Sequence, residues 1–106
     1  MTSPLTLTPT RRADGTCVLT VVGEIDQSNA DDLAAALDDA GGSVVVDLTG
    51  VGYLDSAGLN VLFARSAGGL ELIVPPLLTP VLTVSGLAEL VPVHGPEGAA
   101  PDAPSG

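Results

Sequence analysis

The chain contains no lysine and no tryptophan, and its only aromatic residues are Tyr53 and Phe63. Against thirteen acidic residues it has three cations, Arg11, Arg12 and Arg65, which leaves a formal net charge of −10. Binding to nucleic acid or to an anionic membrane requires clustered cations that neutralise phosphates, so the charge argues against both partners. Two aromatic residues do not make a platform for stacking bases. A strongly acidic surface instead favours a protein partner with a basic patch.

The side chains that usually carry catalysis or bind ligands are also scarce. A phosphate-binding P-loop needs a lysine, which the chain lacks. The segment from Leu54 to Gly58 lacks the first glycine of a nucleophile elbow, and the only histidine, His94, lies near the C-terminus, which argues against a serine hydrolase. One histidine, one cysteine and scattered aspartates do not have the spacing of metal ligands. We therefore predict a protein that is not an enzyme and holds no cofactor or metal.

The low cysteine content and the short apolar runs indicate the cellular compartment of the protein. Cys17 lies in an apolar strand pattern, which predicts a small buried side chain. A single cysteine cannot form an internal disulfide, which is typical of a reducing compartment. The first residues do not show the pattern of a secretory signal, and no apolar run approaches the ~18 residues that span a bilayer. We expect a soluble cytoplasmic domain with a core of Val, Leu, Ile and Ala.

The N-terminal part predicts two strands and a helix. Leu5 and Leu7 alternate with threonines in a short edge strand that ends at Pro9, and residues 16–23 form a second strand antiparallel to the first.

The first helix should have its N-cap at Ser28 or Asn29 and should end at Gly41, which is followed by a second glycine. Leu33 and Leu37 are spaced to share one apolar face of this helix.

The central part predicts a strand, a loop and a second helix. Val44 to Val46 are β-branched, as in a strand that is buried on both faces. Residues 47–52 include Asp, Thr and two glycines, which favour a loop. The second helix is expected from Ser56 to Ala67, with Asp55 or Ser56 as its N-cap.

The C-terminal part predicts a strand over residues 70–74 and a short helix with Thr79 as N-cap, which Gly86 closes. A last strand is expected over residues 90–93.

These elements follow the order β-β-α-β-α-β-α-β. Strands joined through helices imply right-handed crossovers. We therefore predict an α/β fold with a mixed, mostly parallel sheet, an N-terminal antiparallel hairpin and helices packed against the sheet. Residues 1–94 would form this domain, and residues 95–106, rich in Gly, Pro and Ala, a disordered tail.

Ser56 is the main functional candidate. A serine at the positive end of a helix lies beside backbone N–H groups that have no partner within the helix, and these would stabilise a phosphate. The alternative is an ordinary N-cap, and the residues alone leave the two interpretations evenly balanced.

A rival interpretation is that Asp47 is a phospho-acceptor aspartate, as in receiver domains. Those domains need an acidic pair near the first strand and a lysine late in the chain, and this chain has no lysine. Asp47 is instead expected to accept backbone N–H bonds.

The stretch VVVDLTGVGYLDSAGLNVL, residues 44–62, resembles the signature of STAS domains, specifically of the anti-sigma factor antagonists. That signature has a buried strand ending in Asp, a short loop, and Asp-Ser-small-Gly-Leu opening a helix. Residues 23–26 resemble the Gly-x-Leu/Ile-Asp motif that ends the second strand of the family. Residues 85–87 followed by 91–93 resemble the close of its last helix and strand. The resemblance spans about residues 5–94.

This resemblance implies a switch protein. In the family, the unphosphorylated antagonist binds an anti-sigma factor with serine-kinase activity and frees a sigma factor for transcription. The kinase phosphorylates the motif serine, which corresponds to Ser56, and a metal-dependent serine phosphatase reverses the step. By the same resemblance Asp26, Asp55, Gly58 and Asn60 would face the partner. The alternatives are a loop or helix cap for Asp26 and close packing for Gly58.

The chain also departs from the family pattern. Its second helix is expected to be about one and a half turns shorter than usual, and Arg65 is the only basic residue on it. These departures keep a second function open, that of a non-switching STAS scaffold subunit in a transporter or sensory complex. Ser56 favours the switch.

Overall fold

The computed structural model describes residues 5–95, which form one five-stranded sheet with the strands in the order β1-β2-β3-β4-β5. β1 is antiparallel to β2, and the other neighbours are parallel. The strands are β1 (Thr6–Arg11), β2 (Cys17–Ile25), β3 (Val44–Leu54), β4 (Leu70–Ile73) and β5 (Val93–His94). The helices are α1 (Ala30–Ala40), α2 (Ser56–Ala64) and α3 (Thr79–Ser85). The predicted order and the mixed sheet with an N-terminal hairpin are confirmed.

Three short 3₁₀ helices join these elements: η1 (Ser66–Gly68), η2 (Pro76–Leu78) and η3 (Leu87–Glu89). η1 directly follows α2, so the second helix ends at Ala64 rather than at the predicted Ala67.

The edge strand β1 is longer than predicted. It continues through Pro9, which pairs with Leu19 of β2, and ends at Arg11. An edge strand tolerates a proline because only one of its sides must supply ladder hydrogen bonds. Cys17 at the start of β2 is 3% exposed, as its apolar surroundings in the sequence predicted.

The predicted loop over residues 47–52 was wrong, because β3 runs without interruption to Leu54. Its last residues pair with the end of β2, for example Val51 with Gly23, and the pairing is kept by two register shifts, at each of which β3 contributes one extra residue. Gly50 serves this pairing, since a Cβ atom there would lie 3.0 Å from the Val22 Cγ2 atom of β2. Gly50 therefore allows β2 and β3 to approach closely.

The ends of the helices were predicted with mixed success. Gly41 and Gly86 end α1 and α3 with positive φ angles of 57° and 88°, as expected. Thr79 is not an N-cap, because η2 leads directly into α3 and Leu78 occupies the cap position.

The last strand is also shorter than predicted and starts only at Val93. The predicted tail, apart from Gly95, lies outside the described residues.

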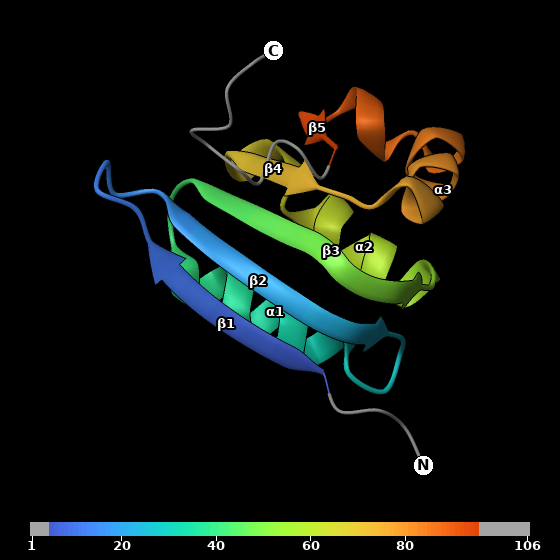
Figure 1. Ribbon diagram of the computed structural model, residues 1–106, viewed down its shortest axis with the longest axis horizontal. Coiled ribbons are helices and arrows are strands. Elements are labelled where there is room, and N and C mark those ends of the chain that lie inside the picture. The colour runs from blue at the N-terminus through green and yellow to red at the C-terminus, as the bar shows by residue number, and fades with distance from the viewer. Residues whose placement is uncertain (1–4, 96–106) are drawn as a thin grey trace.

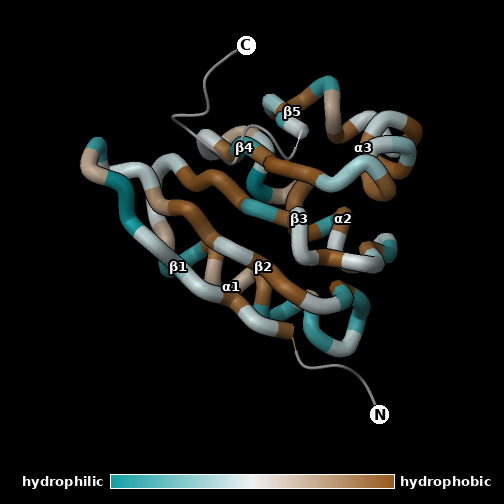
Figure 2. Tube along the Cα trace, viewed as in Figure 1, coloured by the Kyte–Doolittle hydropathy of each residue, from teal (hydrophilic) through white to brown (hydrophobic). Residues whose placement is uncertain are grey.

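Helices α1 and α2 pack side by side on one face of the sheet, and α3 lies beyond the end of β4 (Figure 1). The apolar residues of the central strands, brown in Figure 2, form the core together with the inward faces of the helices. Leu33 and Leu37 of α1 are buried there, as their spacing predicted, along with Leu62 of α2. This packing fixes the position of α2 against the ends of β2 and β3.

Gly58 lets α2 lie this close to the sheet. A Cβ atom at this position would lie 2.5 Å from Leu54 Cδ1 and 2.6 Å from Ile25 Cγ2, and both side chains are buried. Any larger residue must push α2 away from the strands, and overpacking of this kind costs about 1–3 kcal/mol.

We expect Gly58→Ala to lower the free energy of unfolding by about 1–2 kcal/mol, because the clash outweighs the better helix propensity of alanine. For a domain of this size each kcal/mol lowers the melting temperature by about 4–8 °C, which thermal denaturation followed by circular dichroism would detect. Gly52→Ala is the matched control, because a Cβ there meets nothing within 4 Å. Equal melting temperatures for the two variants would contradict this packing role.

Candidate functional site

The first turn of α2 is capped by Asp55. Its Oδ1 atom accepts hydrogen bonds from the backbone N–H groups of Ala57 at 2.9 Å and Gly58 at 3.1 Å. The extended backbone of Asp55, with φ −97° and ψ −175°, directs the carboxylate over the helix end. Of the two N-cap candidates in the sequence, Asp55 therefore takes this role.

Ser56 is the first residue of α2, and its side chain is exposed. Its hydroxyl has no hydrogen-bond partner among residues 5–95, because the neighbouring helix N–H groups already bond to Asp55. The ordinary N-cap interpretation of Ser56 is thus wrong. The expectation that a phosphate here would accept those free N–H groups also needs correction, since Asp55 already occupies two of them. A phosphoryl group on Ser56 would instead lie beside a carboxylate.

Asp26 organises the neighbouring turn between β2 and α1. Its Oδ1 accepts bonds from the backbone N–H and the hydroxyl of Ser28, and these bonds hold the pKa of the Asp26 carboxyl below its ordinary value. Asn29 closes the turn by accepting from the Asp26 N–H at 2.9 Å and donating to the Glu24 carbonyl at 2.8 Å. Asn29 thus sits at the N-cap position of α1 without capping it. Asp26 has the loop-organising role that the sequence left as its alternative.

A backbone hydrogen bond joins the two turns. The N–H of Asp55 donates to the carbonyl of Ile25 at 3.2 Å, so the ends of β2 and β3 are held together. Asp26 and Asp55 therefore lie at the same edge of the sheet, next to Ser56. Parallel strands place their following loops at one edge, and that edge is where open α/β sheets usually carry their binding sites.

The two remaining predicted site residues, Asn60 and Gly58, differ in exposure to solvent. Asn60 is exposed one turn after Ser56, on the same side of α2. Gly58 is buried, so it has the packing role described above rather than a partner-facing one. Tyr53, two residues before Asp55, is 51% exposed, and it adds the only exposed aromatic side chain of the described chain to this edge. The sequence gives no signal for this role, because Tyr53 is exposed only through its place near the end of β3.

Asp47 does not lie with this group. Its Oδ1 accepts from the Thr49 N–H at 3.0 Å and from the Thr49 hydroxyl at 2.6 Å. It thus accepts a backbone bond as predicted, although within β3 rather than in a loop.

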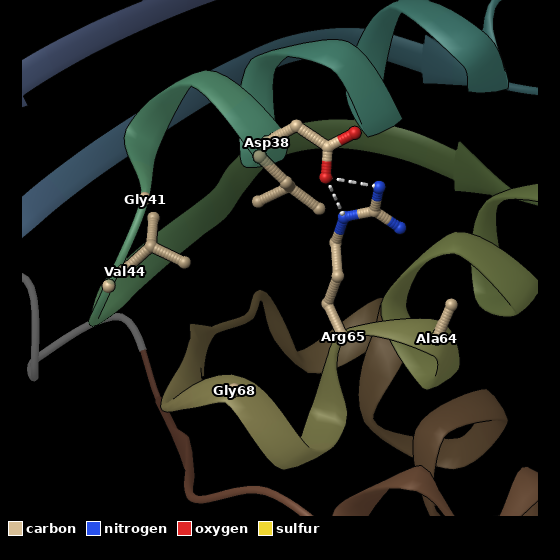
Figure 3. A pocket seen from close by; sticks show the side chains of 8 residues that line it. Asp38, Gly41, Val44, Ala64, Arg65 and Gly68 are labelled. Carbon is tan, nitrogen blue, oxygen red and sulfur yellow. Dashed lines mark hydrogen bonds and ion pairs between the residues drawn. The ribbon is translucent and has the colours of Figure 1, made fainter.

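A pocket of about 260 Å³ lies at the other ends of α1 and α2, near the start of β3 (Figure 3). Figure 3 shows Arg65 reaching across this pocket to Asp38, and the Arg65 Nε atom donates to Asp38 Oδ1 at 3.1 Å. This cross-helix ion pair accounts for Asp38, an acidic residue in the last turn of α1 for which the sequence indicated no role. The pairing neutralises Arg65, which leaves the pocket without a free cation to attract an anionic ligand.

Within residues 5–95, no three His, Cys, Asp or Glu side chains gather where they could hold a metal ion. No helix in that part of the chain is long and apolar enough to cross a membrane.

Comparison with known proteins identifies the family. A family model described as "Mlab, STAS domain" matches residues 9–92. An anti-sigma factor antagonist from Mycobacterium paratuberculosis is 27% identical, with a TM-score of 0.75 over 89% of this chain and 90% of that one. No match was found among curated proteins.

Two structures of SpoIIAA share the fold at lower identity. The anti-sigma factor antagonist SpoIIAA in its unphosphorylated form is 19% identical, with a TM-score of 0.70 over 90% of this chain and 93% of that one. The Bacillus cell fate determinant SpoIIAA in the phosphorylated form is 18% identical, with a TM-score of 0.61 over 90% and 96% of the two chains. With a family model that covers most of its residues and a sheet of matching topology, this chain belongs to the STAS domain family.

Proposed function

We propose that this domain is an anti-sigma factor antagonist whose binding to an anti-sigma factor with serine-kinase activity is controlled by phosphorylation of Ser56. The unphosphorylated protein binds the anti-sigma factor in the cytoplasm and so releases a sigma factor. The kinase supplies ATP, magnesium and the catalytic groups, and a metal-dependent serine phosphatase regenerates the binding form. The domain itself contributes the acceptor hydroxyl and the surface around it.

The observation that carries this proposal is the state of the Ser56 hydroxyl. It is exposed at the tip of α2 and makes no hydrogen bond within the described residues, because Asp55 performs the capping. A kinase can therefore reach it without first unfolding the helix. The solved structures of antagonists that share this fold, one of them phosphorylated, support the same function.

The electrostatics of the site support the proposed switch. Phosphorylation adds about −1.5 to −2 charges at pH 7. On Ser56 this charge would lie beside the carboxylate of Asp55 and at the same edge as Asp26, on a protein whose net charge is already −10. A partner that binds a neutral hydroxyl and two carboxylates must then accommodate a dianion at the centre of its contact. Loss of binding follows because a desolvated excess charge is costly at an interface.

Incubation with ATP, magnesium and a cognate anti-sigma kinase should add one phosphate to the wild-type protein and none to Ser56→Ala. Intact-mass spectrometry measures both. Ser56→Ala is expected to keep the fold, since its hydroxyl has no partner within residues 5–95. Stable kinase binding without any phosphate on the wild type would contradict the switch and favour a non-switching scaffold. Phosphate on Ser56→Ala would show that another residue is the acceptor.

Ser56→Asp should weaken binding to the anti-sigma factor at least tenfold, which corresponds to about 1.4 kcal/mol of binding free energy. The reason is that the new carboxylate lies beside the Asp55 carboxylate. Isothermal titration calorimetry gives the dissociation constant. Ser43→Asp is the matched control, since it adds the same charge just before β3, at the opposite edge of the sheet. If both variants bind equally well, the position of the charge is irrelevant and the proposed interface is wrong.

A further inference from the structure

The segment around α3 differs in charge from the rest of this acidic protein. Residues 72–88 contain no charged side chain, although the chain as a whole carries a net charge of −10. Within the described residues after Arg65, the only carboxylates are Glu71 and Glu89, on either side of this segment, and there is no arginine or lysine. The segment is thus uncharged along its whole length, and the Glu71 carboxylate before it is bonded to His94 Nε2 at 3.1 Å.

Helix α3 and the preceding η2 carry no charge and have apolar side chains on their outer face as well as on their inner face. Leu78 and Leu82 point inward and are buried in the core. On the other side Leu77 is 61% exposed and Val84, seven residues further on, is 88% exposed. A surface helix normally presents charged or polar residues to water, and a helix that is apolar all round is normally covered. The outer side of α3 therefore has the composition of a contact surface.

We call this surface the outer α3 face. Its members are the exposed residues of η2 and α3: Pro76, Leu77, Thr79, Pro80, Thr83 and Val84. Each of these side chains is either apolar or a threonine, so the face can lose water without leaving a charge unpaired.

The outer α3 face lies at the same end of the sheet as Ser56. η2 follows β4, α2 follows β3, and parallel strands send the segments that follow them to the same edge. η2 contacts β3 and η3 contacts α2, which keeps α3 beside this edge. In Figure 1, α3 lies at the end of the sheet where the arrowheads of β2 and β3 point. A partner of ordinary interface size, about 800 Å² on each side, can cover both regions.

Charge decides between the possible occupants. Two copies of this chain would bring two net charges of −10 together, and an anionic bilayer would repel the same charge. A protein partner with an apolar groove and a basic rim gains both from burial of Leu77 and Val84 and from attraction to a domain whose net charge is −10.

We propose that the outer α3 face docks into an apolar, basic-rimmed groove on the same anti-sigma kinase that acts on Ser56. This rests on the proposed function and adds a second contact to it. The uncharged face supplies burial, which phosphorylation does not alter, while Ser56 supplies the contact that phosphorylation breaks. The kinase is thus recognised through the outer α3 face and released through Ser56.

The test compares the double variant Leu77→Gln, Val84→Gln with the wild type in calorimetric titrations against the cognate kinase without ATP. Both glutamines remain uncharged, so a loss of affinity reports lost apolar burial. Val22→Gln is the matched control, because Val22 is 47% exposed on β2, away from α3. Circular dichroism verifies that all three proteins are folded. We expect at least tenfold weaker binding for the double variant and no change for the control.

The other outcomes overturn the inference in distinguishable ways. If the kinase phosphorylates Ser56 and binds the double variant as tightly as the wild type, the docking inference is wrong and the proposed function stands. If the wild type is neither bound nor phosphorylated, both proposals fail. A wild-type dimer in sedimentation velocity that the double variant abolishes would make a second copy the occupant. Binding to phosphatidylglycerol vesicles that the double variant abolishes would make a membrane the occupant.

Discussion

The Asp55 carboxylate determines what the start of α2 can do. Its Oδ1 atom accepts hydrogen bonds from the backbone N–H groups of Ala57 and Gly58. These N–H groups would otherwise be free to bond to the Ser56 hydroxyl. Ser56 is therefore held in a helical conformation with its hydroxyl left unbonded within the described residues. The same carboxylate supplies the negative charge that a phosphate on Ser56 would meet. One residue thus both presents the hydroxyl and, in the proposed function, would make its phosphorylation electrostatically costly for a bound partner.

The surrounding structure keeps this helix end in place. The hydrogen bond from the Asp55 N–H to the Ile25 carbonyl ties the end of β3 to the end of β2. Gly58 lets α2 pack directly on Leu54 and Ile25, so the first turn of the helix cannot shift without disturbing the core. The site is therefore an extension of the packed interior. In the proposed function, this rigidity would let a phosphate on Ser56 disturb the whole contact with the partner.

The patterns with local causes were predictable from the sequence. The apolar runs predicted the order of strands and helices. Gly41 and Gly86 predicted helix ends, because the residue that ends a helix often has a positive φ angle, which favours glycine whatever the fold. Two features that the sequence did not reveal depend on contacts between residues far apart in the chain. Residues 47–52 have the composition of a loop, and only the partner strand β2 makes them a strand. The Asp38–Arg65 pair joins residues 27 apart in the sequence, so the last turn of α1 alone could not reveal it.

The site itself was predicted in part. Ser56 and Asp55 were identified together, but two adjacent residues can both cap a helix, and the choice between them depends on backbone angles that the sequence does not contain. The buried position of Gly58 likewise depends on Ile25, which lies on another strand.

The division of roles between Asp55 and Ser56 is tested most directly by amide hydrogen exchange at Ala57 and Gly58, followed by NMR. The account predicts that both amides are protected in the wild type and in Ser56→Ala, and that they lose protection in Asp55→Ala, whose side chain cannot accept their hydrogen bonds. Loss of protection in Ser56→Ala with protection kept in Asp55→Ala would show that the serine caps the helix. Its hydroxyl would then not be free for modification, and the proposed switch would lose its structural basis.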